Sequence, residues 1–309
     1  MNRIICVCGP TAVGKTKYAI ELAKAVSGEV VSADSMQLYK FMDLGSAKPT
    51  AEEQAEVPHH LVDFVDPRDG FSVAEYQKCA KEAIADIFSR GKTPVISGGT
   101  GLYISSLIYD MDFGSAPKDD EFRQSLTELA KEKGGEHLLE MLREVDPAAA
   151  ERIHPNNVKK IIRAIEVATG TGKGIPAFEE SFKPTGDYGY LLIGLMRDRE
   201  ELYARIDKRV DILVEMGLEK EIRGLLNMGL TADDISMKGI GYKEIIGYFN
   251  GEYDFDEAVR LVKRNTRHYA KRQMTWLRRY KEMHWVNLSE LSEDAAVSTV
   301  ISLATDGNQ

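Results

Sequence analysis

The sequence has few cysteines and no long hydrophobic run. Its 309 residues include three cysteines, Cys6, Cys8 and Cys79, with no metal-ligand spacing and no His cluster near them. That pattern argues against a zinc site and favours buried thiols. No apolar stretch approaches the roughly 18 residues of a membrane span. The short apolar run near the start is followed by no cleavage site of small residues. We therefore expect no membrane association and a cytoplasmic location.

Acidic residues are absent from one segment, although the chain as a whole is acidic. The net charge is −9, which disfavours non-specific binding of nucleic acid by the whole surface. Residues 258–281 nevertheless hold nine Lys or Arg and no Asp or Glu, with Tyr269, Trp276 and Tyr280 among them. Cations interleaved with aromatic rings are typical of RNA binding by phosphate contact and base stacking. The alternative is a solvated helix face, although such faces normally mix signs.

The strongest motif follows the first apolar run, residues 4–8. Residues 9–16 match the phosphate-loop pattern G-x-x-x-x-G-K-[ST] in full. Glycines let such a loop curl, so that N–H groups and a helix N-terminus face an anion. The pattern predicts that Lys15 supplies a mobile charge and that the Thr16 hydroxyl helps to hold Mg²⁺. An ordinary strand-turn-helix corner is the alternative. The residues predicted to bind phosphate are Gly9, Thr11, Ala12, Val13, Gly14, Lys15 and Thr16.

The order of patterns predicts the architecture. The first 113 residues alternate strand-like and helix-like segments, which indicates βαβ units and a parallel sheet covered by helices. After a hinge-like break at 114–117, only helical patterns follow until a strand at 188–195. We predict an α/β fold with a core domain of residues 1–113 plus 186–309, a helical C-terminal region, and an inserted all-helical domain at 114–185 that could move as a lid. Further strands are expected at 4–8, 29–33, 60–64 and 94–97. Helices are expected from residue 15, at 73–90, 119–133, 136–145, from 147, at 156–169 ended by Gly170, at 199–216, and from about 255.

Functional residues are expected at the carboxyl ends of parallel strands. Asp34 follows such a strand, and it could be a general base, bind a metal-bound water, or only cap a helix. Residues 98–101, Gly-Gly-Thr-Gly, follow another strand and let the backbone approach a ligand or a neighbouring loop. Thr100 could offer its hydroxyl there, or could cap the next helix.

For other candidate site residues, the sequence allows both a functional and a structural interpretation. Arg205 and Arg209 lie four residues apart on a predicted helix, so both can face one site, but Glu201, Asp207 and Asp211 could instead pair with them. A basic group on one side of another helix could contact a polyanion or form an exposed face: Lys159, Lys160 and Arg163. His59 and His60 face opposite ways on an extended strand, which favours structural roles over a shared metal.

Taken together, these motifs resemble the tRNA dimethylallyltransferase family in its bacterial form. The resemblance covers nearly the whole chain in the expected order, and no Cys follows Cys79 as it would in the zinc-finger extension of eukaryotic relatives. The motifs that carry it are residues 9–16, 32–39, 42–49, 58–60, 98–103, 152–156, 239–242 and 267–278.

The resemblance implies a prenyl transfer. A dimethylallyl group would pass from dimethylallyl diphosphate to the exocyclic amino nitrogen of an adenosine beside the anticodon of tRNA, releasing diphosphate. Asp34 would accept the amine proton, and Thr100 would hold the substrates in line or only position Asp34. Lys15, with Mg²⁺ on Thr16, would stabilise the leaving diphosphate, and Arg205 and Arg209 would form a second clamp.

We expect a monomer, and the resemblance implies that it binds the anticodon stem-loop of tRNA. The matching tRNA-contact positions are Asp34, Ser35, Met36, Gln37, Thr100, Arg123, Lys159, Lys160, Arg163, Lys238, Lys243, Lys263, Arg264 and Arg267.

Two other functions remain in view. A small-molecule kinase with the same loop would bind ATP, but it predicts an Asp for magnesium at the end of a strand where residues 97–99 are Ser-Gly-Gly. A non-catalytic, NTP-dependent RNA-binding switch would have no need of a carboxylate at position 34.

Overall fold

The computed structural model describes residues 2–111, 113, 119–175 and 182–305. Their contacts divide the chain into two compact units, Met1–Ile108 with Thr185–Gln309, and Tyr109–Pro184. The hinge-like residues 114–117 lie outside the described residues, as do residues 176–181. Each unit has a hydrophobic core of its own.

A six-stranded parallel sheet forms the centre of the first unit, in the order β3-β2-β4-β1-β5-β6. The predicted parallel sheet is therefore confirmed. Its central strand is the apolar run of the sequence, and Ile4 and Val7 there are completely buried, as expected of a strand covered on both faces. The strands are β1 Arg3–Cys8, β2 Gly28–Ala33, β3 His59–His60, β4 Thr93–Gly98, β5 Gly189–Met196 and β6 His284–Asn287.

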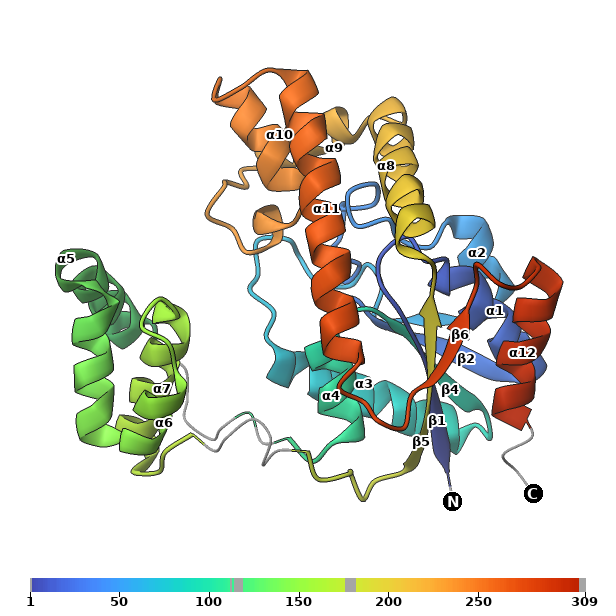
Figure 1. Cartoon of the computed structure of the whole chain (residues 1–309), viewed down its shortest axis with the longest axis horizontal. Helices are drawn as coiled ribbons and strands as arrows, with labels where there is room; N and C mark the ends of the chain where they lie inside the picture. Colours follow the sequence, from blue (N-terminus) through green and yellow to red (C-terminus); the bar gives the residue numbers. More distant parts are fainter. Residues whose placement is uncertain (1, 112, 114–118, 176–181, 306–309) are drawn as a thin grey trace. The chain divides into compact units, whose positions relative to one another are not determined.

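Helices cover both sides of this sheet (Figure 1). On one side α1 (Lys15–Ala25) packs against α12 (Glu293–Thr305), and on the other α3 (Val73–Ser89) packs against α4 (Gly101–Ile108). The capping box predicted at the start of α3 is present, because Ser72 and Glu75 each accept a hydrogen bond from the other's backbone N–H. Cys6 and Cys8 are buried free thiols, as the sequence predicted, whereas Cys79, also expected to be buried, is only half-buried. The short helix α2 spans Ala51–Glu56.

The helices between β5 and β6 pack on one another. Contacts join α8 to α9, α8 to α11 and α10 to α11. The longest of them, α11, is the predicted basic helix, and the Asp254 side chain caps it by accepting from the Glu257 N–H. The bounds are α8 Arg199–Glu215, α9 Leu218–Asn227, a short 3-10 turn Ser236–Lys238, α10 Tyr242–Phe249 and α11 Phe255–Leu277.

The described part of the second unit is helical, as predicted. It comprises α5 (Asp120–Val145), α6 (Pro147–Arg152) and α7 (Val158–Thr171). Gly134 has a φ of 83° and interrupts α5, close to the break expected between two helices at 133–136. Leu138, Leu142 and Ile161 are completely buried in its core.

Three sequence predictions of elements were wrong. The strand expected at 60–64 ends at His60, because Leu61 and Asp63 adopt positive φ values of 60° and 58° and turn the chain. The helix expected to stop at Gly170 continues to Thr171 and ends at Gly172, whose φ is 67°, a left-handed conformation that glycine adopts freely. The last third is not wholly helical, because β6 adds a four-residue strand to the sheet edge.

Candidate active site

The phosphate loop lies between β1 and α1 and curls as the motif predicts. Ala12 and Gly14 have positive φ values of 63° and 110°. A side chain on Gly9 would place its Cβ 2.8 Å from the carbonyl oxygen of Leu195. Because α1 begins without a side-chain cap and without an acidic residue in its first turn, its N–H groups are available to an anion. A pocket opens over this loop, lined by Thr11, Ala12, Gly14, Lys15, Thr16, Asp34, Gln37, Ser46, Ala47 and Arg209, among others.

Arginines from the β5–α8 region hold the loop from outside. The Arg197 Nε donates to the carbonyl oxygen of Val13 at 3.1 Å, and the Arg205 Nε donates to that of Ala12 at 3.1 Å. These bonds fix the backbone of the loop that lines the pocket. Arg197 was not singled out from the sequence, although its position directly after a strand of the sheet is where functional residues were expected.

Arg209 lines the same pocket. The acidic residues that could have paired with Arg205 and Arg209 bind other cations. Asp207 pairs with Arg267, Asp211 lies 2.5 Å from Lys263, and Glu201 lies 2.5 Å from Arg197. Among the residues that the structure describes, no carboxylate lies within ion-pair distance of Arg209. The alternative of a salt-bridged surface therefore does not apply to it.

Asp34 lies at the carboxyl end of β2 and faces this pocket, half-buried. Its Oδ1 accepts a hydrogen bond of 2.9 Å from the Met36 N–H, which makes a local turn rather than a helix cap, because turn residues and no helix follow. One carboxylate oxygen therefore supports the loop, and the other has no hydrogen-bond donor among the described residues.

Thr100 supports the loop that carries Asp34. Its hydroxyl oxygen accepts a hydrogen bond of 3.1 Å from the Ser35 N–H, and its own N–H donates to Ala33 O at 3.1 Å. The Gln37 side chain turns inward, accepting from the Ser32 hydroxyl at 3.1 Å and donating to Ala47 O at 3.1 Å. Both side chains thus hold the loops around the pocket in place.

The electrostatics follow from burial. Burial lowers the pKa of Lys15 to about 8, against a smaller opposing effect of Asp34, and its ammonium donates to Pro10 O at 2.9 Å. Burial likewise lowers the pKa of Arg209. Burial and then Asp34 raise the pKa of Tyr269 to about 12. Cations held in a partly desolvated site bind an anion more strongly than exposed ones would.

The loop of residues 42–49 closes another side of the pocket, and a carboxylate that the sequence did not reveal anchors it. Glu221 in α9 accepts from the successive N–H groups of Asp43, Leu44 and Gly45 at 2.8, 2.6 and 3.0 Å. It also accepts from the Tyr242 hydroxyl at 2.9 Å. No local pattern could have identified Glu221, because the three N–H groups that it binds lie more than 170 residues away.

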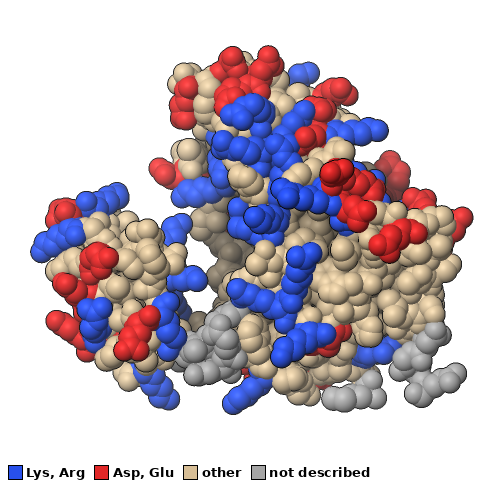
Figure 2. Space-filling model, viewed as in Figure 1, with Lys and Arg blue, Asp and Glu red and all other residues tan. Residues whose placement is uncertain are grey.

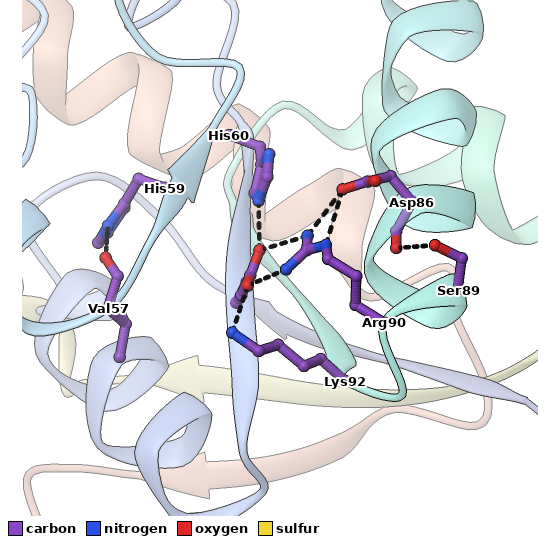
Figure 3. Close-up of polar contacts among 8 residues, drawn as sticks. Val57, His59, His60, Asp86, Ser89, Arg90 and Lys92 are labelled. Carbon is purple, nitrogen blue, oxygen red and sulfur yellow. Dashed lines mark hydrogen bonds and ion pairs between the residues drawn. The ribbon is translucent and has the colours of Figure 1, made fainter.

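The two histidines have different surroundings. His59 lines the phosphate pocket, and its Nδ1 lies 2.8 Å from Val57 O. His60 lies 2.7 Å from the buried carboxylate of Glu29, at the other end of β2. Arg90 and Lys92 bind the same carboxylate (Figure 3). A structural role for His60, preferred from the sequence, agrees with this cluster.

The predicted tRNA-contact residues of the first unit are partly exposed and partly half-buried. Figure 2 shows Lys and Arg side chains gathered over the part of this face where α11 lies in Figure 1. Lys238, Lys243 and Arg264 are exposed, whereas Lys263 and Arg267 form ion pairs with Asp211 and Asp207 of α8.

Of the three aromatic residues in the basic segment, Tyr269 and Trp276 of α11 are half-buried, and Tyr280, which lies three residues beyond the end of α11, is buried. Tyr280 is only 3% exposed, and its hydroxyl donates to Gly101 O at 3.0 Å. The Trp276 Nε1 donates to the Ser105 hydroxyl at 3.4 Å. The prediction that Tyr280 stacks on RNA bases is therefore wrong, and the ring of Trp276 packs toward Gly101.

In the second unit the predicted tRNA contacts fall into two pairs. Lys159 and Lys160 are exposed. Arg123 and Arg163 both bind Glu166, which is 4% exposed. The two arginines thus neutralise a buried carboxylate, a structural contribution that the sequence did not indicate.

Comparisons with known proteins agree on one family. A family model described as IPP transferase matches residues 37–280. The tRNA dimethylallyltransferase of Alkaliphilus oremlandii is 53% identical over 288 residues, which is 93% of this chain and 92% of that protein. That of Acetivibrio thermocellus is 51% identical over 298 residues, 96% of this chain and 95% of that protein.

Solved structures give the same result. The full-length tRNA isopentenylpyrophosphate transferase of Bacillus halodurans matches with a TM-score of 0.75 and 40% identity, over 99% of this chain and 96% of that one. A eukaryotic dimethylallyltransferase acting on tRNA matches with a TM-score of 0.87 and 27% identity, over 99% of this chain and 79% of that one.

Proposed function

Because this chain belongs to the IPP transferase family, we propose that it transfers a dimethylallyl group from dimethylallyl diphosphate to tRNA. The acceptor is the exocyclic amino nitrogen of an adenosine next to the anticodon, and diphosphate is released. The observation that carries this proposal is the 53% identity to a tRNA dimethylallyltransferase over 93% of the chain. The enzyme acts as a monomer in the cytoplasm, where its tRNA substrate is found.

The phosphate pocket supports this reaction through its charges. The allylic carbon–oxygen bond breaks, the electron pair leaves with the diphosphate, and the amino nitrogen bonds to the freed carbon. Negative charge therefore grows on the diphosphate in the transition state. Lys15 and Arg209 line the pocket over the phosphate loop, where the diphosphate would lie. Arg205 contributes by holding the loop at Ala12.

Asp34 fits the part of the proton acceptor. The amine loses a proton as the new carbon–nitrogen bond forms, and a carboxylate at the pocket can take it. Asp34 keeps one oxygen free of hydrogen-bond donors from the described residues, while Met36 fixes the other. Thr100 positions this loop through Ser35, which favours a supporting role over direct contact with the substrates.

Mg²⁺ fits the site as a partner of the diphosphate. In the described residues, no group of three or more His, Cys, Asp or Glu is arranged to hold a metal ion. Mg²⁺ is commonly bound by substrate phosphates together with few protein ligands, and the Thr16 hydroxyl lines the pocket where they would lie. When bound there, the ion would neutralise charge on the departing diphosphate.

The test is a transfer assay on unmodified tRNA with adenines beside the anticodon. Purified protein, dimethylallyl diphosphate and Mg²⁺ should add one five-carbon unit to the tRNA, measured by mass spectrometry. In a parallel reaction, ATP replaces the allylic donor, which tests the kinase alternative. Unmodified tRNA together with turnover of ATP would refute the proposal in favour of the kinase.

A further inference from the structure

The inner face of α11 rests on two loops of the active site at once. Gln273, which is 5% exposed, accepts a hydrogen bond of 2.8 Å from the Thr11 N–H. Its amide nitrogen donates to Gly99 O at 3.0 Å. One side chain thus bridges the phosphate loop and the turn that follows β4, across sequence separations of 262 and 174 residues.

The glycines of that turn make this close approach possible. A Cβ on Gly99 would lie 2.2 Å from the Gln273 amide nitrogen and 2.8 Å from the carbonyl oxygen of Gly9. A Cβ on Gly101 would lie 2.1 Å from the Trp276 ring. The sequence left open whether these glycines admit a ligand or a neighbouring segment. At Gly99 and Gly101 the space is filled by side chains of α11.

A stripe of side chains continues this packing contact along the helix. Tyr269, Gln273 and Trp276 follow at intervals of four and three residues, which places them on one face of α11, and Tyr280 lies three residues beyond the helix end at Leu277. The Tyr269 hydroxyl lies close to Thr100 and Gln273. The Tyr280 hydroxyl donates to Gly101 O. The exposed cations of α11 lie on the remaining surface of the helix, so the packing of this stripe against the active-site loops leaves them available to a polyanion.

We propose that Gln273 is a positioning residue for the transfer reaction, which fixes the phosphate loop relative to the loops that carry Thr100 and Asp34. The chain of contacts runs from Thr11 through Gln273 to Gly99, and from the neighbouring Thr100 to Ser35 beside Asp34. This inference rests on the proposed function. A displacement of about 1 Å between reacting groups can lower a rate about 100-fold.

The chemistry of the side chain explains why an amide is needed. Thr11 offers a donor and Gly99 offers an acceptor, and only a side chain with both functions satisfies the two. A carboxylate keeps the bond to Thr11 but turns a second acceptor toward Gly99 O. A methionine of similar volume satisfies neither group, and at 5% exposure water cannot readily replace the lost bonds.

The experiment compares Gln273→Glu and Gln273→Met with the wild type. Thr275→Ala is the control, because Thr275 lies on the same helix, is exposed, and bonds, among the described residues, only to Lys271 O within α11. Calorimetry measures the Kd of inorganic diphosphate with Mg²⁺, and the transfer assay gives kcat and the KM of each substrate. Thermal melting shows which fraction of each variant is folded.

We expect both Gln273 variants to bind diphosphate about tenfold more weakly, as the loss of one or two buried hydrogen bonds implies. The kcat/KM for dimethylallyl diphosphate should fall by at least the same factor, with the KM for tRNA within twofold of the wild type. Thr275→Ala should match the wild type throughout.

Two results would overturn the positioning role. The first is that both variants fold and have the Kd and kcat/KM of the wild type. The second is failure of both variants to fold, which would assign Gln273 to the core of the protein alone. A wild type that transfers no prenyl group, yet binds diphosphate more tightly than the variants, would refute the proposed function and leave the loop contact standing.

Discussion

Lys15 should take up a proton when an allylic diphosphate binds. In the ligand-free protein, burial lowers its pKa from 10.5 to about 8, which corresponds to about 3 kcal/mol against the charged form. Between these two pKa values the folded chain holds fewer protons than the unfolded chain, so this group lowers stability below pH 8 and the loss is recovered as the pH rises toward 10.5. A bound diphosphate places negative charge beside the ammonium and raises its pKa again.

The size of the effect follows from these values. At pH 9 about nine in ten empty sites should hold neutral Lys15, so binding should take up about 0.9 proton per site. Above pH 8 the affinity for the allylic diphosphate should therefore fall by up to about tenfold per pH unit. At pH 7 the uptake should be small, because Lys15 is already charged.

Calorimetry in two buffers of different ionisation enthalpy measures this uptake directly. The Lys15→Met variant is titrated beside the wild type, so that protons taken up by the ligand itself can be subtracted. Equal uptake by wild type and Lys15→Met at pH 9 would refute the reasoning. So would a wild-type affinity that stays constant between pH 7.5 and 9.5 after the same subtraction.

Three further predictions concern other parts of the molecule. Asp34→Ala should lower the transfer rate about 100-fold or more while the Kd of diphosphate stays within about threefold; equal losses in both would show a structural role. Hydrogen bonds from Arg90 hold the pKa of Glu29 well below its usual range, so its contribution to stability is present above about pH 4.5 and is lost as the pH falls. Glu29→Gln should lower the free energy of unfolding at pH 7 by about 2 kcal/mol and flatten its dependence on pH below 5 in urea titrations; an unchanged slope would contradict this. Arg264→Ala should reduce the salt dependence of tRNA binding by about one unit of slope, and Lys263→Ala by less, because a carboxylate of α8 already pairs with Lys263; equal effects would count against the ion pair in solution.

Much of the fold could be predicted because its signals are local. The apolar run at residues 4–8, the phosphate motif and the capping box before α3 each lie within a few residues of the element they specify. Where the signal was short or the backbone unusual, prediction failed. The four residues of β6 carry little periodicity, and the positive φ values of Leu61 and Asp63 that end β3 are conformations that propensity does not predict for those residue types.

The residues of the candidate site also divide into those that local patterns predicted and those that they did not. Lys15, Asp34 and Arg209 line one pocket as expected from positions after strands and on one helix face. Glu221 could not be predicted, because its role as an anchor of the loop depends on hydrogen bonds from three N–H groups more than 170 residues away. The inward stripe on α11 did have a signal, since Tyr269 and Trp276 lie two helical turns apart. We interpreted these rings as partners of RNA, and the period itself indicated a face packed on protein.

That stripe changes what the basic helix means for the enzyme. A helix that only bound tRNA could be displaced without disturbing the phosphate loop, but α11 contacts that loop through Gln273 and the turn after β4 through Gln273 and Trp276. Its ion pairs with α8 connect it further to the helix that carries Arg205 and Arg209. The exposed cations of α11 and the groups that line the pocket over the phosphate loop thus belong to one packed assembly. Any shift of α11 when a polyanion binds would reach the phosphate loop and the turn at Gly99 together, because the Gln273 side chain bonds to both.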